Sequence, residues 1–331
     1  MKLMITLLFF LLTGCILTHS ELSLSYATMG LELWFDKMIP TLLPFMILSG
    51  IMVRMNLTEG FTLFVQPIIK PVFRVSKNVC YCMLMGFLCG FPMGAKTVQD
   101  LYSQQLISKR EAEYLLAFCN NIGPVYFCGF VLPLLHRKLL APYLIGMYGL
   151  PLLYGLLLRY TKFRDLEEAF TASAYHTNTG STSCGLYFAK GTQNSMSEKK
   201  ATPQITLATL LTATDASIKS ALQSILNLGG YMILFNLFNL VPHLLLGEAP
   251  FFLAPLFEIS GGLRLLKDSL PIYTLLLLPF GGFSCIAQTY SCIRETPLSI
   301  ADYTYHKLAL TAITACYYLG WFLLSSSSFM C

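Results

Sequence analysis

The sequence predicts an all-α polytopic membrane protein, with two inverted repeats that each contain broken or re-entrant helical hairpins, as transporters do. Three observations lead to this fold class. Hydrophobic residues make up 55% of the 331 residues and charged residues 12%, about half the charged share of a soluble domain. Several apolar runs reach the roughly 20 residues that a helix needs to cross hydrocarbon. Two motifs recur along the chain, and membrane carriers are often built from internal repeats.

Six apolar runs are the candidate membrane spans: residues 3–18, 34–53, 112–135, 139–158, 218–246 and 303–324. The first run has two interpretations. Lys2 and the apolar core that ends near Cys15 resemble a signal peptide with a lipoprotein cleavage box, which processing would remove. The alternative is a retained first span. We favour retention, because a multispanning protein already inserts through its own helices.

Composition and charge divide the chain into four parts. Residues 1–30 hold the first membrane helix and an external segment, and residues 31–158 hold the first repeat with a connecting helix. Residues 159–204 are rich in Ser, Thr, Gly and Asn and carry several Lys and Arg, which predicts a flexible cytoplasmic linker. Residues 205–331 hold the second repeat. Suppose that Lys2 is cytoplasmic, that each full span crosses the membrane once, and that the broken elements return to the side they came from. The second repeat then starts on the opposite side of the membrane from the first, so the two repeats are inverted.

The clearest internal repeat joins residues 90–97 (GFPMGAKT) to residues 282–289 (GFSCIAQT), at an offset of 192 residues. The same offset places Gln66 opposite Glu258. In both halves, the segments that follow the first span are short or interrupted by Pro and Gly: residues 61–73, 79–102, 251–266 and 271–293. Such breaks persist at membrane depth only when they are buried in protein or line a wet cavity. We therefore predict re-entrant hairpins or broken helices at these four places.

A series of short motifs carries a family resemblance: residues 34–35 (WF), 39–45 (IPTLLPF), 90–96 (GFPMGAK), 108–113 (SKREAE), 118–124 (FCNNIGP) and 281–284 (GGFS). In this order they resemble the YlbJ family of sporulation integral membrane proteins, which carries the nucleoside-recognition, or Gate, domain. The resemblance covers residues 31–324. It implies a multi-pass protein of the bacterial inner membrane that is needed for the spore envelope or cortex. A nucleoside-like solute follows only by analogy, because fold does not fix function.

The first candidate site is the turn formed by Gly90, Phe91, Pro92 and Gly94. Its glycines and proline would expose backbone donors, and a helix that begins near Gly94 would point its positive end at a polar or anionic solute. Lys96 would add a charge. The alternative is that the glycines only permit close packing and that Lys96 extends to the membrane interface.

A second candidate site lies where Asn120, Asn121 and Gly123 precede Pro124 inside an apolar run. Proline removes a helical hydrogen bond there. The two amides could satisfy the freed carbonyls or bind a polar solute. The alternative is ordinary hydrogen bonding between helices.

Glu258 is the third candidate, followed closely by Ser260. A carboxylate in hydrocarbon costs about 2.5–3.5 kcal/mol on insertion scales, so it should be paired, protonated or functional. We expect a coupling proton or cation there, with Gln66 as its neutral counterpart. The alternative is a salt bridge from Glu258 to Arg264 or Lys267.

Gly282, Ser284 and Gln288 form the counterpart of the first turn, although Ser284 stands where the first repeat has Pro92. Gln288 could hydrogen-bond a solute or simply pack.

These residues favour a carrier that moves or binds a small polar solute with proton or cation coupling. A non-transporting assembly factor or receptor is the alternative, and an enzyme is not expected because no nucleophile–base pair can be assembled. The 11 cysteines contain no CxxC pair, so we expect neither a metal site nor a cofactor. Expected partners are the lipid bilayer, the solute and a second copy of the chain in a homo-oligomer. Nucleic acid is excluded, because no basic stripe is present.

Overall fold

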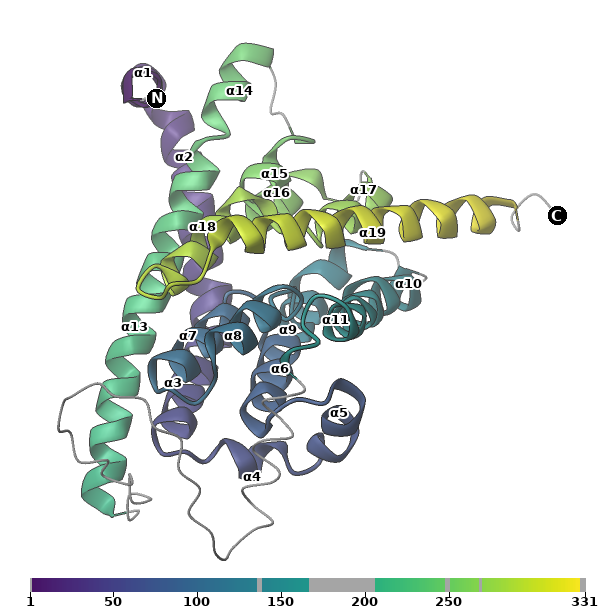
Figure 1. Ribbon diagram of the computed structural model, residues 1–331. Coiled ribbons are helices and arrows are strands. Elements are labelled where there is room, and N and C mark those ends of the chain that lie inside the picture. The colour runs from purple at the N-terminus through teal and green to yellow at the C-terminus, as the bar shows by residue number, and fades with distance from the viewer. Residues whose placement is uncertain (1, 136–138, 167–205, 248–250, 268–269, 328–331) are drawn as a thin grey trace, which may run out of the picture.

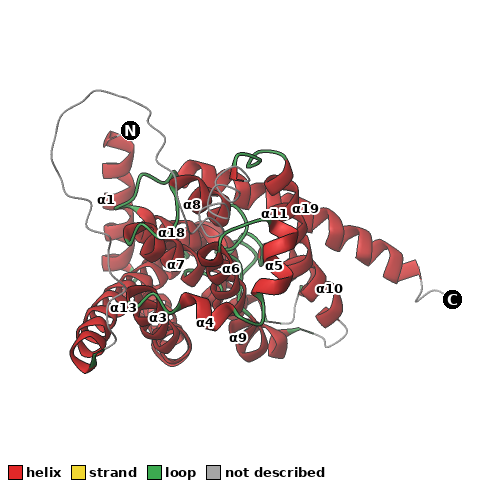
Figure 2. Cartoon of the chain, turned by 60° about the horizontal axis from the view of Figure 1, so that its bottom comes forward, coloured by secondary structure: helices red, strands yellow, loops and turns green. Residues whose placement is uncertain are grey.

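The computed structural model describes residues 2–135, 139–166, 206–247, 251–267 and 270–327. All regular elements in these ranges are helices (Figure 2). Five helical stretches are long and apolar enough to span a membrane: Ser20–Arg54, Leu140–Tyr160, Leu207–Leu246, Ile272–Ile293 and Ile300–Leu324. Each of the first four joins two or more consecutive helices. A sixth candidate, Gln66–Phe73 with Lys77–Cys89, is bent by 110° and is either a broken span or a re-entrant loop. The chain is therefore an all-α polytopic membrane protein, as predicted.

The N-terminal region differs from the sequence prediction. Residues 20–33 form helix α2 (Ser20–Leu33), which continues through a π-helical turn, η1 (Trp34–Met38), into α3 (Ile39–Arg54). These 35 residues form one rod of about 52 Å, where a short external segment before a separate span was expected. The reason is packing: α2 buries a stripe that includes Gly30, whose missing Cβ would lie 2.9 Å from the Cα of Ile233.

The longest helix, α13 (Leu207–Leu237), is the scaffold of the fold. It lies alongside the α2–α3 rod over most of its length (Figure 1). The indole of Trp34 donates to the carbonyl of Ile225 at 2.8 Å and packs on Gly229. Farther along the same contact, Gly50 of α3 faces Ser217 of α13. Small residues thus let the two long helices approach closely, as they do in other membrane proteins.

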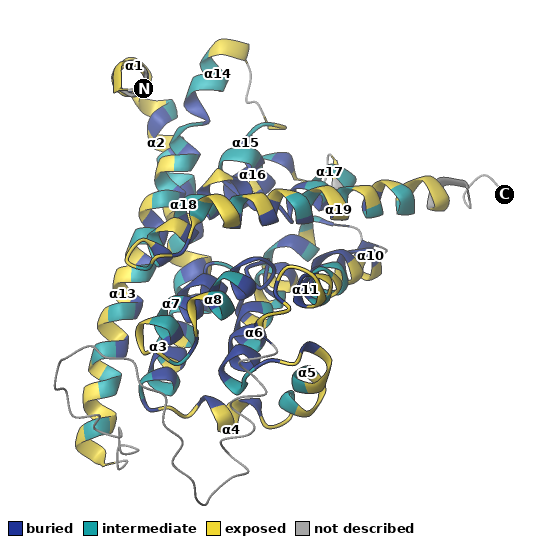
Figure 3. Ribbon diagram, viewed as in Figure 1, coloured by how far each residue is buried: buried dark blue, intermediate teal, exposed yellow. Residues whose placement is uncertain are grey.

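Most of the remaining helices gather on one side of this pair, whereas α1 and α14 lie at its upper end in Figure 1. Figure 1 shows α19 running across α13 rather than along it. The buried residues concentrate where α6, α7 and α8 meet (Figure 3).

The helices other than α2, η1, α3 and α13 are α1 (Lys2–Thr18), α4 (Thr58–Thr62), α5 (Gln66–Phe73), α6 (Lys77–Cys89), α7 (Met93–Ser103), α8 (Lys109–Leu116), α9 (Pro124–Tyr126), η2 (Phe127–Val131), η3 (Leu132–Leu134), α10 (Leu140–Leu144), η5 (Ile145–Gly149), α11 (Leu150–Tyr160), α14 (Leu240–Leu246), α15 (Ala254–Phe257), α16 (Ile259–Leu266), α17 (Pro271–Leu277), α18 (Gly282–Ile293) and α19 (Ile300–Ser327).

The predicted full span over residues 112–135 is wrong. Instead, α8 ends at Leu116, the chain loses helical structure, and a helix starts again only at Pro124. Pro124 offers no N–H to the preceding turn. The interruption that the sequence predicts at residues 120–124 therefore divides the expected span into two separate helices.

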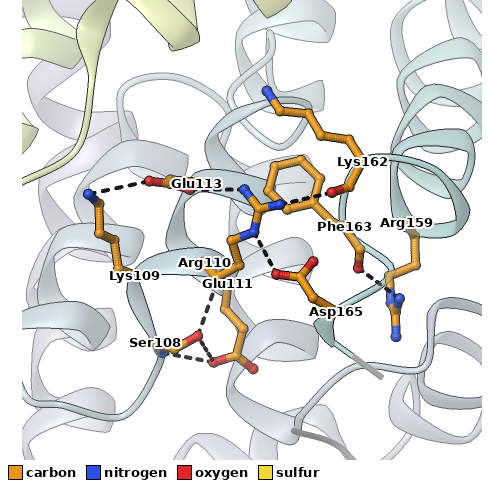
Figure 4. A network of polar contacts seen from close by, with 9 residues as sticks. All are labelled: Ser108, Lys109, Arg110, Glu111, Glu113, Arg159, Lys162, Phe163 and Asp165. Atoms are coloured by element: carbon orange, nitrogen blue, oxygen red, sulfur yellow. Dashed lines mark hydrogen bonds and ion pairs between the residues drawn. The ribbon is translucent and has the colours of Figure 1, made fainter. Parts of the chain in front are cut away.

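A polar network fixes the start of α8 against the end of α11 (Figure 4). The Arg110 guanidinium donates to Asp165 at 2.8 Å and to the Lys162 carbonyl at 2.9 Å, and it lies 4.5 Å above the Phe163 ring. The hydrogen bond from Arg110 holds the pKa of Asp165 below its usual value. The fully buried Arg159 donates to the Phe163 carbonyl nearby. Because α8 is held in this way, the break that follows it has a fixed starting point.

The helix boundaries follow the 192-residue offset of the sequence repeat. Helices α5, α6, α7 and α8 begin at residues 66, 77, 93 and 109, and α16, α17, α18 and α19 begin at residues 259, 271, 282 and 300. Each pair agrees with the offset to within about three residues. The inverted orientation of the two repeats stays a prediction. Residues 167–205, which make up most of the expected linker, lie outside the described residues.

The topology can be tested by single-cysteine labelling in a cysteine-depleted variant. We expect a cysteine at Ser195 to react from the cytoplasmic side and one at Ser20 from the external side, because Lys and Arg concentrate in residues 159–204 and are absent from residues 20–31. Labelling would be scored in intact cells and in inverted vesicles. External reactivity of the Ser195 position would contradict the inverted count of spans.

Candidate functional site

Four helix breaks meet at the centre of the molecule. They are residues 90–92 between α6 and α7, 117–123 between α8 and α9, Glu258 between α15 and α16, and 278–281 between α17 and α18. The first two pair through backbone: the Phe91 N–H donates to the Asn121 carbonyl at 2.6 Å. The other two also touch, since a Cβ on Gly282 would lie 3.0 Å from the Pro255 carbonyl oxygen. A Cβ on Gly281 would lie 3.6 Å from the Phe91 ring, which joins the two pairs.

Glycine makes the first pair possible. Gly90 has φ +79°, in the left-handed region, and a Cβ there would lie 2.2 Å from the Gly123 nitrogen. Gly86 and Gly94, one turn before and one turn after, face the Cys119 carbonyl oxygen, at 2.2 and 2.5 Å from their missing Cβ positions. The glycines of the sequence motif therefore bring one broken backbone against another. This is the packing role that the sequence left as an alternative.

A small cavity of about 30 Å³ lies beside these breaks, between α3 and α13. Its walls are mostly apolar, with one polar end: Met38, Thr41, Leu42, Phe45, Cys89, Phe91, Ile122, Gly123, Val125, Tyr126, Leu228, Met232, Glu258, Ser260 and Gln288. This volume suits one or two water molecules, since each needs about 10–15 Å³. It is far below the roughly 300–1,000 Å³ of pockets that hold small-molecule ligands.

Glu258 is the charged residue among those that line the cavity, and it is 2% exposed. Its carboxylate caps α16: one oxygen accepts from the Ser260 N–H at 3.1 Å, and the other accepts from the Gly261 N–H at 2.6 Å and from the Asn236 amide at 3.2 Å. The expected alternative, a salt bridge to Arg264, does not form. Arg264 instead pairs with Glu32 at 2.8 Å on the surface.

Gln288 and Ser260 complete the polar end of the cavity. The Gln288 side-chain amide donates to the Ser284 hydroxyl at 2.8 Å, whereas its carbonyl oxygen is buried and accepts no hydrogen bond from any described residue. The Ser260 hydroxyl accepts from the Tyr126 hydroxyl at 3.0 Å. The site thus presents acceptors, one of them unused.

Asn120 links three helices, while the Asn121 amide bonds within its own turn. The Asn120 amide donates to Thr289 of α18 at 2.9 Å and to Tyr303 of α19 at 3.1 Å, and its oxygen accepts from the Ala95 N–H of α7 at 3.3 Å. The Asn121 amide donates to the Phe118 carbonyl at 2.7 Å. Both amides are buried. The helix-to-helix bonding that the sequence left open is thus present at Asn120.

Lys307 of α19, 3% exposed, supplies a donor that proline removes. In a continuous helix the Asn120 carbonyl would accept from the N–H of residue 124, but Pro124 has none. The Lys307 ammonium donates to this carbonyl at 2.8 Å instead and lies 5.9 Å from the centre of the Phe91 ring. Among the described residues, no ion pair involves Lys307 or Glu258, although both are buried.

The structure does not bring all the predicted residues to the cavity. Lys96 is buried on α7, where its ammonium binds Asp100 and, at 3.1 Å, Gln99. Gln66 begins α5, is only half-buried and does not line the cavity. Pro92 and Gly94 also do not line it, while Phe91, Gly123, Glu258, Ser260 and Gln288 do.

Other residues at the site were missed: Tyr126, Asn236, Thr289, Tyr303 and Lys307. The sequence contained a signal for Lys307, because this residue lies inside the apolar run 303–324. A charge in such a run should be paired or functional, as was argued for Glu258. Asn236 and Thr289 carry no such signal. In the described part of the chain, no three His, Cys, Asp or Glu side chains gather as a transition-metal site would require.

Comparison with known proteins gives one relevant relative. The chain is 26% identical, over 350 aligned residues, to the sporulation integral membrane protein YlbJ of Bacillus subtilis (strain 168), which covers 92% of this chain and 79% of that protein. No protein-family model matches the chain, and no solved structure matches it. The chain is therefore YlbJ-like, which confirms the resemblance drawn from its motifs, and it is a multi-pass integral membrane protein.

Replacing Gly90 with alanine should destabilise the fold by about 2 kcal/mol or more. Holding an L-residue at φ +79° and ψ −165°, a conformation that is essentially restricted to glycine, costs about 1–3 kcal/mol, and the added methyl also meets the Gly123 backbone. Thermal unfolding of the purified protein would measure the loss. Gly230→Ala is the matched control, since no atom lies within 4 Å of its missing Cβ. Equal melting temperatures for the two variants would contradict the close contact of the breaks.

Replacing Lys307 with methionine should cost about 1–3 kcal/mol of stability, because it leaves the buried Asn120 carbonyl without a donor. Lys307→Arg, which keeps a donor, should lose less. Equal losses for Lys307→Arg and Lys307→Met would show that a donor at this position does not stabilise the break.

Proposed function

We propose that this protein is a carrier of the sporulating cell membrane that binds a small polar solute at the Glu258 cavity and couples its movement to a proton or a cation. The observation that carries the proposal is the state of Glu258. It is 2% exposed, it lies at a helix break beside a cavity, and three N–H donors rather than a cation hold its carboxylate. Intramembrane acids in such positions typically mark ion or proton pathways.

The arrangement of the breaks supports the same proposal. In many carriers the solute lies between two repeats, where half-helices begin or end near the middle of the membrane. Here α16 begins directly after Glu258, which lines the cavity, and α18 begins at Gly282, whose missing Cβ would lie 3.3 Å from the Ile259 nitrogen. Opening the space between these breaks and the α3–α13 pair would enlarge a site that is small in the present structure. The sporulation context comes from the YlbJ relative, and a role in cortex formation would follow from the same kinship.

A second candidate, a membrane assembly factor or receptor without transport, is favoured by one observation. The cavity holds about 30 Å³, too little for a nucleoside-sized solute in this conformation. A Glu258 without an ion pair favours the carrier, and a small cavity favours the assembly role. The two candidates differ in whether the charge of Glu258 is needed once the protein has folded.

The test is complementation of a Bacillus subtilis strain that lacks YlbJ, first with the unchanged chain and then with variants at position 258. Glu258→Gln and Glu258→Asn remove the charge, and asparagine is also a good helix cap. Glu258→Asp keeps both charge and cap. Glu32→Gln is the matched control at an exposed ion pair. Membrane abundance and the number of heat-resistant spores would be measured together.

We expect Glu258→Asn to keep near-normal membrane abundance and to lower the spore count by at least about tenfold, the effect of a 1.4 kcal/mol loss in a working step. Glu258→Asp and Glu32→Gln should remain close to the unchanged chain. Full activity of Glu258→Asn at normal abundance would remove the charge from the mechanism. A parallel fall in abundance and spores for both Asn and Gln would favour a structural cap.

A further inference from the structure

The polar lining of the Glu258 cavity is made of oxygen acceptors. The Glu258 carboxylate keeps lone pairs beyond its three N–H partners, and the Gln288 carbonyl oxygen has no partner among the described residues. The Ser260, Tyr126 and Thr41 hydroxyls add oxygens. The Gln288 amide N–H group is turned away, toward Ser284. The cavity therefore complements an occupant that is positive or that only donates hydrogen bonds.

An ionised Glu258 favours a positive occupant over a neutral one. Taking an ionised carboxylate out of water costs several kcal/mol unless a counter-charge or strong hydrogen bonds compensate it. Lys307 is the nearby buried cation, but its ammonium is held by the Asn120 carbonyl behind the Phe91 ring. Phe91 lines the cavity, and the Lys307 ammonium lies 5.9 Å from the centre of its ring. A water molecule would use the acceptors but would add no counter-charge to the three N–H donors at Glu258.

The size of the cavity limits the occupant further. One water molecule needs a cavity of about 10–15 Å³, so a cavity of about 30 Å³ admits only a small occupant. A sodium ion coordinated by the lining oxygens fits this space, and so does an ammonium ion, whereas a quaternary ammonium such as choline does not. Oxygen ligands of this kind suit hard cations. The unpartnered Gln288 oxygen, 4% exposed, is the independent sign of a missing ligand.

We infer that the cavity binds one small monovalent cation, held by the Glu258 carboxylate and the Gln288 carbonyl oxygen, with the hydroxyl oxygens completing its shell. This inference rests on the proposed function only in giving the cation a coupling role, since binding itself needs no transport. The occupant is a bare metal ion or an N–H cation of the same size.

The experiment uses the purified full chain in detergent, with unfolding followed by a dye that reacts with buried cysteines as they become exposed. Melting would be measured against increasing NaCl, or increasing NH4Cl, with choline chloride replacing each salt to hold the ionic strength constant. We expect a saturable rise of several degrees with NaCl or with NH4Cl, because a ligand that binds the folded state stabilises it. The salt that acts identifies the occupant as a metal ion or an N–H cation.

The variants separate the site from general salt effects. Glu258→Gln should abolish the rise, and Gln288→Met should raise the half-saturating salt concentration by about tenfold or more, as loss of a bond to a charged group implies. Glu32→Gln and Gln223→Met are the matched controls, since both residues lie on the surface, and both should behave as the unchanged chain. If Glu258→Gln is too unstable to purify, Gln288→Met carries the test.

An equal effect of choline chloride, a rise that persists in Glu258→Gln, or an unchanged half-saturation in Gln288→Met would each overturn the inference and leave water as the occupant. The failure of the carrier proposal looks different. Cation binding by a purified protein whose Glu258→Asn variant forms normal spores would keep the site and remove its coupling role. Loss of spores without any cation effect would keep the carrier and remove the cation.

Discussion

The structure depends on one constraint: a helix broken inside hydrocarbon leaves backbone groups that water cannot reach, so the protein itself must satisfy them. The chain does this by placing its breaks against one another. The turn at Gly90 pairs with the break at Asn121 through a backbone hydrogen bond, and glycines at positions 86, 90 and 94 remove the side chains that would keep the two apart. The cavity exists because these breaks meet; continuous helices would close the space with side chains.

The same constraint joins stability to function. Residues that satisfy freed backbone groups are also the polar residues around the cavity, because both are needed at the same depth. Glu258 caps α16 and lines the cavity, and Asn120 links α7, α18 and α19 while its own carbonyl is held by Lys307. A movement of one break therefore changes hydrogen bonds and cavity shape together. A variant of these residues can lose activity through misfolding as well as through a change at the cavity, so its folding must be measured together with its activity.

Much of the architecture could be predicted from the sequence, and the limits have physical causes. Apolar length and charge identified the polytopic class, and Pro and Gly marked the breaks, since both act locally. The register of the repeat was also visible, from GFPMGAK and GFSCIAQ. The α2 helix was missed because it is held by contact with α13, about 200 residues away, which no local pattern encodes.

Side-chain partners show the same limit at the site. Lys96 was expected at a solute, yet it pairs with Asp100, four residues on along the same helix face; the spacing was visible but the burial was not. Gln66 matches Glu258 in the repeat, yet its helix lies toward the surface. Glu258 was recognised because an acid in an apolar run is unusual by itself. Its partner Asn236 could be found only by knowing how α13 packs.

The two charged residues at the centre show how the halves have diverged. At Glu258 a helix begins, so N–H groups are free, and an acid accepts from them. At Asn120 the chain follows the end of α8, so a carbonyl is free, and a lysine donates to it. Each charge also has the sign that the nearby helix end favours. Both breaks therefore meet the same requirement with opposite charges. The helix boundaries repeat, but the electrostatics do not, since Glu258 lines the cavity and Lys307 does not. This asymmetry gives the site a defined polarity, which a symmetric pair of breaks would lack.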